Sequence, residues 1–328
     1  MKFNPQNLFL VLAATPLVFV SGQKKLILTN DDGWRFQLLS KGTSSSSGTG
    51  WAVAMIRAQN DALKEAGYDV VLSCPAVNKS GTGSSTAVPT VLQTPCEFDT
   101  CPAGSPAVGF NESDPRLNYV NAFPADAASF GIQTLAPKFF DGTAPDFVVA
   151  GPNVGNNLGP TVLISGTVGA ACEAALEGIP SVAFSSPSPP LTQVSYTTLE
   201  SDPSSADTLS ALVYASLTTT FVNTLLGAGC DPILPKGISV NVNYPSTTNC
   251  SSSEDFKWVF SRINADSSAT DVETCGSTHL PAESAVVAHA GCFSSVSVFN
   301  ASTKADVDAD TQAFVLNKLS GLLTCLPS

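Results

Sequence analysis

The amino-acid sequence predicts a doubly wound α/β fold with three layers, in which a mostly parallel sheet lies between two layers of helices. Between residues 24 and 245, short apolar runs alternate with segments whose apolar residues recur at helical spacing. The chain has 328 residues, of which 43% are hydrophobic, so it can bury a core of the size that this fold needs. Residues 246–328 are expected to form a β-rich extension and a terminal helix at 306–323.

The first strand–helix–strand unit follows residue 24. Residues 26–29 form an apolar run typical of a strand, residues 52–66 have helical spacing and end at Gly67, and residues 69–72 form a second strand. A helix that connects two strands in this way implies that the strands pair in parallel.

The same alternation continues through the middle of the chain and predicts a Rossmann-like core. Helices are predicted at 125–135, 166–176 and 206–226, strands at 147–150, 182–184 and 236–244, and a loop of glycine and asparagine at 151–159. In a doubly wound sheet, ligands bind at the carboxyl ends of the strands. The residues that carry chemistry are therefore expected in the loops that follow those strands.

The first 22 residues are typical of a signal peptide. Lys2 gives a basic start, residues 8–20 are almost entirely apolar, and small residues follow at 21–22. We expect cleavage to leave one domain, residues 23–328, that is secreted to the medium or the cell wall. The alternative is a buried strand or helix at this end of the chain. No later stretch is expected to span a membrane.

A segment rich in serine and glycine, residues 35–50, interrupts the first unit between Trp34 and Trp51. Two interpretations remain open. The segment is either a mobile flap over the site or a translated intron, since Trp34 could be joined to Ala52 without disturbing the unit.

The charge of the chain argues against nucleic acid as a partner. Lysine and arginine total 15 against 27 aspartates and glutamates, which gives a net charge of −12. Binding to a phosphate backbone needs a basic face, which this composition does not supply.

Nine cysteines indicate disulfide bonds once export is accepted. Cys96 and Cys101 flank a short loop and are the expected local pair, whereas Cys74 and Cys172 are expected to be core residues. Pairing is left open for the remaining five, Cys230, Cys250, Cys275, Cys292 and Cys325. No cysteine or histidine spacing matches a zinc site.

Four sequons are typical of a secreted glycoprotein: Asn78, Asn111, Asn249 and Asn300. Asn78 is expected to stay unglycosylated because a glycan two residues before Ser80 would crowd the predicted site. The other three asparagines are freer candidates.

Four polar stretches follow predicted strands or open a helix. They are Asn30-Asp31-Asp32-Gly33, the loop with Ser80 and Gly81, the loop 151–159 with Asn153 and Asn157, and Ser165-Gly166-Thr167. Taken singly, each is compatible with an ordinary turn, a solvated loop or a helix cap. Together they would lie along one rim of the sheet, where carboxylates can hold a cation and a helix start can bind phosphate.

The order and spacing of these stretches resemble the SurE family of phosphatases, and in particular its secreted fungal acid phosphatases. The resemblance extends to residues 124–126, 240–245 and 291–298, so it covers nearly the whole mature chain. The departures are Ala150 and Asn156, which replace a serine and a proline of the family pattern, and the segment 35–50.

The resemblance implies a phosphoric monoester hydrolase of the acid phosphatase or 5'/3'-nucleotidase type that depends on Mg²⁺ or Mn²⁺. It implies Asp31, Asp32, Ser80 and Asn153 as metal ligands, and Asn157, Ser165, Gly166 and Thr167 as phosphate-side residues. We expect Asp32 to be the base that orients the attacking water, with Asn30 as a second catalytic residue. His279 and His289 are expected to be ordinary surface or strand residues.

The resemblance also implies small phosphate monoesters such as nucleoside monophosphates as substrates, and a homodimer or higher homo-oligomer. Two rival functions stay open. One is a secreted protein that keeps this fold but has lost turnover; the other is a nucleotide-sugar transferase that uses the same rim.

Overall fold

The structure is a computed structural model that describes residues 22–33, 53–96, 101–187, 194–229 and 231–327. The expected signal peptide, apart from Gly22, and the segment 35–50 with its two flanking tryptophans lie outside the described residues.

Within these ranges, ten strands form one sheet. The strands are β1 (Lys25–Thr29), β2 (Asp69–Pro75), β3 (Val108–Asn111), β4 (Asp114–Val120), β5 (Phe147–Val154), β6 (Ser181–Ser186), β7 (Ile238–Asn243), β8 (Lys257–Ser261), β9 (Phe293–Asn300) and β10 (Leu323–Thr324). They lie in the order β10-β8-β9-β7-β6-β5-β1-β2-β4-β3. The expected β-rich extension therefore continues the sheet of the core.

The pairing is parallel except for β3 with β4 and β7 with β9. Strand order reverses between β1 and β5, because the chain builds outward from β1 to β2 and β4 and then returns to β5, β6 and β7. A reversal of this kind leaves a crevice at the carboxyl ends of the two strands, where doubly wound proteins bind ligands. Register pairs Thr29, the last residue of β1, with Ala150 inside β5, so the loop after β1 starts beside the second half of β5.

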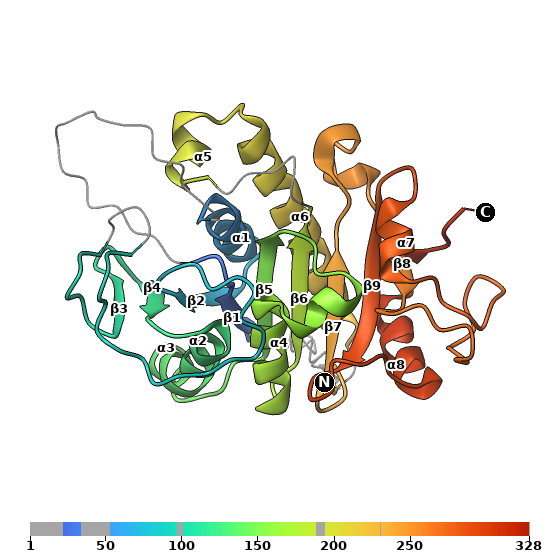
Figure 1. Ribbon diagram of the computed structural model, residues 1–328, viewed down its shortest axis with the longest axis horizontal. Helices are drawn as coiled ribbons and strands as arrows, with labels where there is room; N and C mark the ends of the chain where they lie inside the picture. Colours follow the sequence, from blue (N-terminus) through green and yellow to red (C-terminus); the bar gives the residue numbers. More distant parts are fainter. Residues whose placement is uncertain (1–21, 34–52, 97–100, 188–193, 230, 328) are drawn as a thin grey trace, which may run out of the picture.

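Helices cover both faces of the sheet. The main ones are α1 (Val53–Glu65), α2 (Pro124–Phe130), α3 (Ala136–Phe139), α4 (Gly166–Leu176), α5 (Thr197–Ser201), α6 (Ala206–Gly227), α7 (Glu283–Ala288) and α8 (Ala309–Leu319). Figure 1 shows α1, α5 and α6 on one face, and α2, α3 and α4 on the other. The sequence prediction of a three-layer α/β fold is confirmed.

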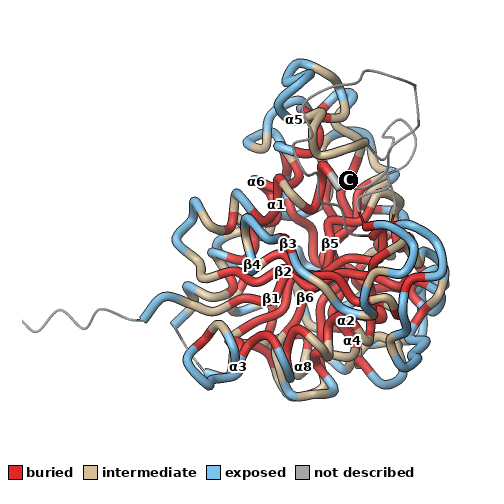
Figure 2. The backbone as a smooth tube through the Cα atoms, turned by 90° about the vertical axis from the view of Figure 1, so that its left-hand side faces the viewer, coloured by how far each residue is buried: buried red, intermediate tan, exposed pale blue. Residues whose placement is uncertain are grey.

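The core is centred on the strands, as Figure 2 shows. The largest cluster packs α1, α6 and α8 against the sheet and includes the fully buried Phe184, Tyr214, Phe221 and Tyr244. A second cluster packs the alanine-rich α4 against β5 and β6, and its small side chains allow the helix to approach the sheet closely.

The expectation that no stretch after the signal peptide could span a membrane is wrong for helix α6 by length and composition. Among the described residues, it is the one helix long and apolar enough to cross a bilayer. More than half of its apolar window is nevertheless buried inside the protein, including Tyr214, Phe221 and Leu225. The core helix of a soluble domain has the same properties, so its apolar composition is explained by packing.

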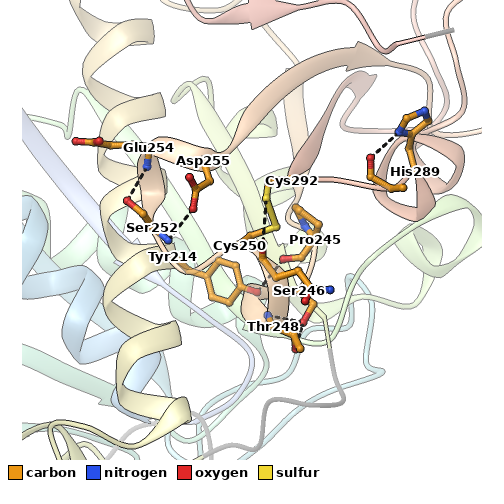
Figure 3. The surroundings of a disulfide bond; sticks show 12 residues. Tyr214, Pro245, Ser246, Thr248, Cys250, Ser252, Glu254, Asp255, His289 and Cys292 are labelled. Atoms are coloured by element: carbon orange, nitrogen blue, oxygen red, sulfur yellow. Dashed lines mark hydrogen bonds between the residues drawn. A yellow bond between two sulfur atoms is a disulfide. The ribbon is translucent and has the colours of Figure 1, made fainter.

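Three disulfides among the described residues join Cys96 to Cys101, Cys250 to Cys292 and Cys275 to Cys325, and Cys230 lies outside those residues. The expected local pair is confirmed, and Cys74 and Cys172 are free and buried, as predicted. Figure 3 shows the second disulfide, which ties the chain after β7 to the start of β9. Close by, the Tyr214 hydroxyl donates to the Pro245 carbonyl oxygen at 2.8 Å and fixes the same segment to α6.

Several boundaries differ from the prediction. The strand predicted to end at Ala150 continues to Val154 across a bulge, so part of the expected loop lies within the sheet. The helix predicted at 125–135 is α2 followed by a π-helix, Gly131–Leu135. Strands β3 and β4 were not predicted, because their polar and proline-containing residues give no apolar alternation.

Candidate active site

The polar residues after β1 are buried at the point where strand order reverses. Asn30, Asp31 and Asp32 are at most 2% exposed. Gly33 follows with φ +94°, a conformation that glycine adopts readily, and so lets the chain turn sharply after the two carboxylates. Two adjacent buried carboxylates are costly unless a cation or several donors compensate their charge.

The Asp31 carboxylate lies against the start of α4. Thr167 Oγ1 donates to its Oδ1 at 2.7 Å, and a Cβ built on Gly166 would lie 2.9 Å from its Oδ2. Burial raises the pKa of Asp31, while hydrogen bonds from Thr167 and Gly166 act in the opposite direction. The positive end of the helix thus faces this carboxylate, and position 166 has room only for glycine.

Asp32 is bonded to the part of β5 that follows its bulge and carries Asn153. Asp32 Oδ2 accepts from Val154 N at 3.3 Å, and Asn153 Nδ2 donates to the Gly155 carbonyl oxygen at 2.7 Å. These contacts leave the Asn153 Oδ1 buried without a hydrogen-bond partner, and both polar side-chain atoms of Asn30 are in the same state. An unpaired buried oxygen beside two carboxylates is an available ligand for a cation.

Ser80 lies in the loop after β2, which borders the same rim. Its side chain is exposed. Lys79 N donates to the Asp31 carbonyl oxygen at 2.8 Å, which fixes the loop to the end of β1. Ser80 N donates to Asn78 Oδ1 at 2.8 Å, so the sequon asparagine is part of the turn that presents Ser80. Farther along, Gly83 N donates to the Ile164 carbonyl oxygen at 2.8 Å.

The phosphate-side candidates at α4 have structural partners in this geometry. Ser165 Oγ accepts from Val168 N at 3.1 Å and caps the helix, while the Thr167 hydroxyl is directed to Asp31. Ser165, Gly166 and Thr167 therefore lie at the rim as predicted. Their hydroxyls hold the helix start and Asp31 in place, and whether they also contact phosphate stays a prediction.

Asn157 belongs to a buried network beneath the loop 155–159. Its backbone N donates to Asn243 Oδ1 at 2.8 Å, its Nδ2 donates to Ser185 Oγ at 2.7 Å, and its carbonyl oxygen accepts from Asn241 Nδ2 at 2.8 Å. Its contact with phosphate stays a prediction. These bonds give it an anchoring role between the loop, β6 and β7.

Glu283 is a residue of this network that the sequence reasoning missed. Its Oε1 accepts from Gly159 N at 2.7 Å and its Oε2 from Asn241 Nδ2 at 2.9 Å. The side chain is fully buried at the start of α7. Glu283 follows Gly159 by 124 positions in the sequence. The sequence around Glu283 has no hydrophobic periodicity that would have indicated its burial. The only indication in the sequence was its acidic side chain, which favours the start of a helix.

The burial of Glu283 predicts that stability falls as the pH rises. Burial raises its pKa from 4.5 to about 8, and the nearby Asp306 acts in the same direction. Between these two pH values the unfolded chain has lost the proton that the folded chain keeps, so the folded state loses its advantage as the pH passes from 4.5 to 8. Each pKa unit corresponds to about 1.4 kcal/mol, so we expect a loss of a few kcal/mol.

Chemical denaturation in EDTA at several pH values tests this prediction. The Glu283→Gln variant, which cannot ionise, should show a flatter dependence of unfolding free energy on pH than the wild type. Identical pH profiles for the two proteins would show that Glu283 does not titrate in this range.

The donor set of the site fits a hard divalent cation. It contains two carboxylates, an unpaired amide oxygen and a nearby hydroxyl, which are the oxygen ligands that Mg²⁺ and Mn²⁺ prefer. Over the described ranges, no group of three or more histidine, cysteine, aspartate or glutamate side chains could hold a metal. The rings of His279 and His289 are hydrogen-bonded to the backbone carbonyl oxygens of Ala269 and Ala290.

Comparison with known proteins identifies a family and several relatives. The family model described as Survival protein SurE matches residues 26–270. The chain is 32% identical to an acid phosphatase of Yarrowia lipolytica, over 92% of this chain and 86% of the relative. It is also 32% identical to a 5'-nucleotidase SurE of Thermosynechococcus vestitus, over 68% of this chain and 64% of that protein.

A solved structure shows the same fold. The crystal structure of a SurE protein from Aquifex aeolicus is 22% identical in sequence, with a TM-score of 0.53, and the match covers 90% of this chain and 99% of that one. Since the family model spans most of the chain and the yeast relative nearly all of it, the chain belongs to the SurE family.

Proposed function

We propose that the protein is a divalent-metal-dependent phosphomonoesterase whose active site is the rim formed by β1, β5, the Ser80 loop and the start of α4. The observation that carries the proposal is that the buried Asp31 and Asp32 and the unpaired Asn153 oxygen lie on β1 and β5, the two strands between which strand order reverses. The names of the relatives, acid phosphatase and 5'-nucleotidase, support the reaction class. SurE proteins generally depend on a divalent metal.

Asp31, Asp32, Ser80 and Asn153 would hold the cation, which when bound would polarise a phosphoryl oxygen. Asp32, fully buried and fixed by Val154 N, is placed to accept a proton from the attacking water. As the water oxygen bonds to phosphorus, the ester P–O bond breaks and the leaving oxygen is protonated from solvent. Thr167 and Gly166 hold Asp31 in position throughout.

Hydrolysis of an aryl phosphate by the purified protein tests the proposal. We expect release of free phosphate with Mn²⁺ or Mg²⁺, loss of activity in EDTA, and recovery when metal is added back. Turnover that persists in EDTA would contradict the metal dependence. Absence of turnover with every divalent metal would favour the inactive rival, and retention of the phosphate on a product would favour the transferase.

The substrates that we propose are small phosphate monoesters, including nucleoside monophosphates. The name of the cyanobacterial relative supports the nucleotides, and the name of the yeast relative supports a broader range. A panel of nucleoside, sugar and aryl phosphates would separate these ranges by kcat/KM.

We also propose that the protein is exported and glycosylated. The three disulfides support an oxidising compartment. The side chain of Asn111 is only 5% exposed and its Oδ1 accepts from Ser113 N, so this sequon is a poorer candidate than expected, whereas Asn249 is exposed. Peptide mass spectrometry of protein from the culture medium would identify the mature N-terminus and the occupied sequons.

A further inference from the structure

The proposed reaction poses an electrostatic problem at this rim. A phosphate monoester carries up to two negative charges, and it would approach two buried carboxylates in a protein of net charge −12. A single divalent cation offsets only the two carboxylates. A positively charged side chain beside the helix start would therefore strengthen the binding of the phosphoryl group.

Lys79 is the one lysine or arginine in the loops that follow β2, β4, β5, β6 and β7, or in residues 30–33 after β1. Arg57, in the second turn of α1, faces the segment after β6, because its guanidinium carbon lies 5.4 Å from the centre of the Tyr196 ring. These loops thus hold one cationic side chain of their own, while Lys304, from the segment after β9, donates from its Nζ to the Leu163 carbonyl oxygen at 3.4 Å.

The surroundings of Lys79 connect it to the helix start through Phe123 and Pro124. Its backbone is fixed to Asp31, and its Nζ lies 5.3 Å from the centre of the Phe123 ring. Pro124, which follows Phe123 in the sequence, packs against the first residue of α4. Its Cγ lies 2.9 Å from the position that a Cβ on Gly166 would occupy. The ammonium group is thus linked through neighbouring contacts to both Asp31 and the first turn of α4.

The charge of Lys79 is not neutralised by a carboxylate. None of the ion pairs among the described residues involves it, and the face of Phe123 holds the ammonium group without supplying a counter-charge. A half-buried lysine in this state keeps its donors available for an anion, and lysine binds phosphate as a point charge.

We propose that Lys79 binds the phosphoryl group of the substrate and offsets its charge during hydrolysis. The inference rests on the proposed function, and it adds a substrate-binding residue that neither the fold nor the carboxylates supply. It also gives the Ser80 loop two roles, one toward the cation and one toward the substrate.

Binding of inorganic phosphate to the Mn²⁺-loaded protein, measured by calorimetry, tests the proposal without turnover. Lys79→Met keeps the aliphatic stem and removes the charge, and the dissociation constant for phosphate should rise by about 10- to 100-fold. Lys79→Arg should stay within a few-fold of the wild type. Affinity for Mn²⁺ alone should not fall in either variant.

Lys138→Met is the matched control. The Nζ of Lys138 also lies over aromatic rings, 4.9 Å from the centre of Phe139 and 5.5 Å from that of Phe110, but on α3. Its loss should leave phosphate affinity unchanged. If Lys79→Met melts early, Lys79→Gln is measured in its place below the melting temperature.

The proposal is overturned if phosphate affinity in the Lys79 variants stays within about two-fold of the wild type, or if the wild type does not bind phosphate. Its failure can be told apart from failure of the proposed function. A wild type that binds phosphate through Lys79 but hydrolyses no ester would support this inference and contradict the enzyme.

Discussion

Replacement of Asp31 by asparagine should lower kcat/KM for an aryl phosphate by at least about 10³-fold, because the variant loses an ionised metal ligand at the centre of the site. Stability should change in the opposite direction to activity. Burial raises the pKa of Asp31, so its ionised form destabilises the metal-free protein near neutral pH, and asparagine removes that charge while keeping an acceptor for Thr167. The melting temperature in EDTA should therefore equal or exceed that of the wild type.

Thermal unfolding with and without Mn²⁺ separates loss of the site from loss of the fold. A cation that binds the native state at 100 times its dissociation constant stabilises it by about 2.7 kcal/mol, and only the wild type should show this gain. Asp146→Asn is the control, because that carboxylate accepts from Lys25 N at the opposite edge of the sheet. Near-normal turnover by Asp31→Asn would remove this residue from the metal site.

The second large effect is expected at Gly169, in the middle of α4. An alanine inside a helix normally stabilises a protein by about 0.5–1 kcal/mol relative to glycine. Here a Cβ would lie 2.1 Å from the Gly83 carbonyl oxygen, which is backbone and cannot rotate away. Overpacking of this kind should destabilise the protein by about 1–3 kcal/mol. It should also displace the loop that carries Ser80 and so reduce activity by roughly ten-fold or more.

Gly227→Ala provides the comparison within the same chain. Gly227 is also helical, at the end of α6, and a Cβ there would meet nothing within 4 Å. Its substitution should be neutral or stabilising and should leave turnover unchanged. Equal effects of the two substitutions in urea unfolding would show that the Ser80 loop does not pack on α4 as described.

The parts of the fold that the sequence could predict are those with a strong local signal. The bounds of α4 were predicted to the residue, and those of β1 and α6 to within one residue, because serine caps and long apolar periodicity mark them. The extension of β5 to Val154 could not be predicted. Glycine and proline at 151–152 normally end a strand, and only pairing with β6 keeps them in the sheet.

The site was predictable where residues are adjacent in sequence and hidden where they meet through the fold. Asp31, Asp32, Asn153 and the start of α4 lie on one rim as expected, because parallel strands bring their carboxyl ends together. The contact of Lys79 with Phe123 and that of Glu283 with Gly159 join residues 44 and 124 positions apart. No local pattern encodes such contacts, and each becomes visible only when the strand order is known.

The anchoring of the loop 155–159 by Asn243 and Glu283 has a consequence for biosynthesis. All the proposed metal ligands have been synthesised once residue 153 leaves the ribosome, yet the bonds that order the neighbouring loop come from residues made much later. A nascent chain that ends before α7 would therefore contain these ligands without the finished rim. Catalytic competence should consequently arise late, when the last third of the chain has joined the sheet, rather than stepwise as each strand is translated.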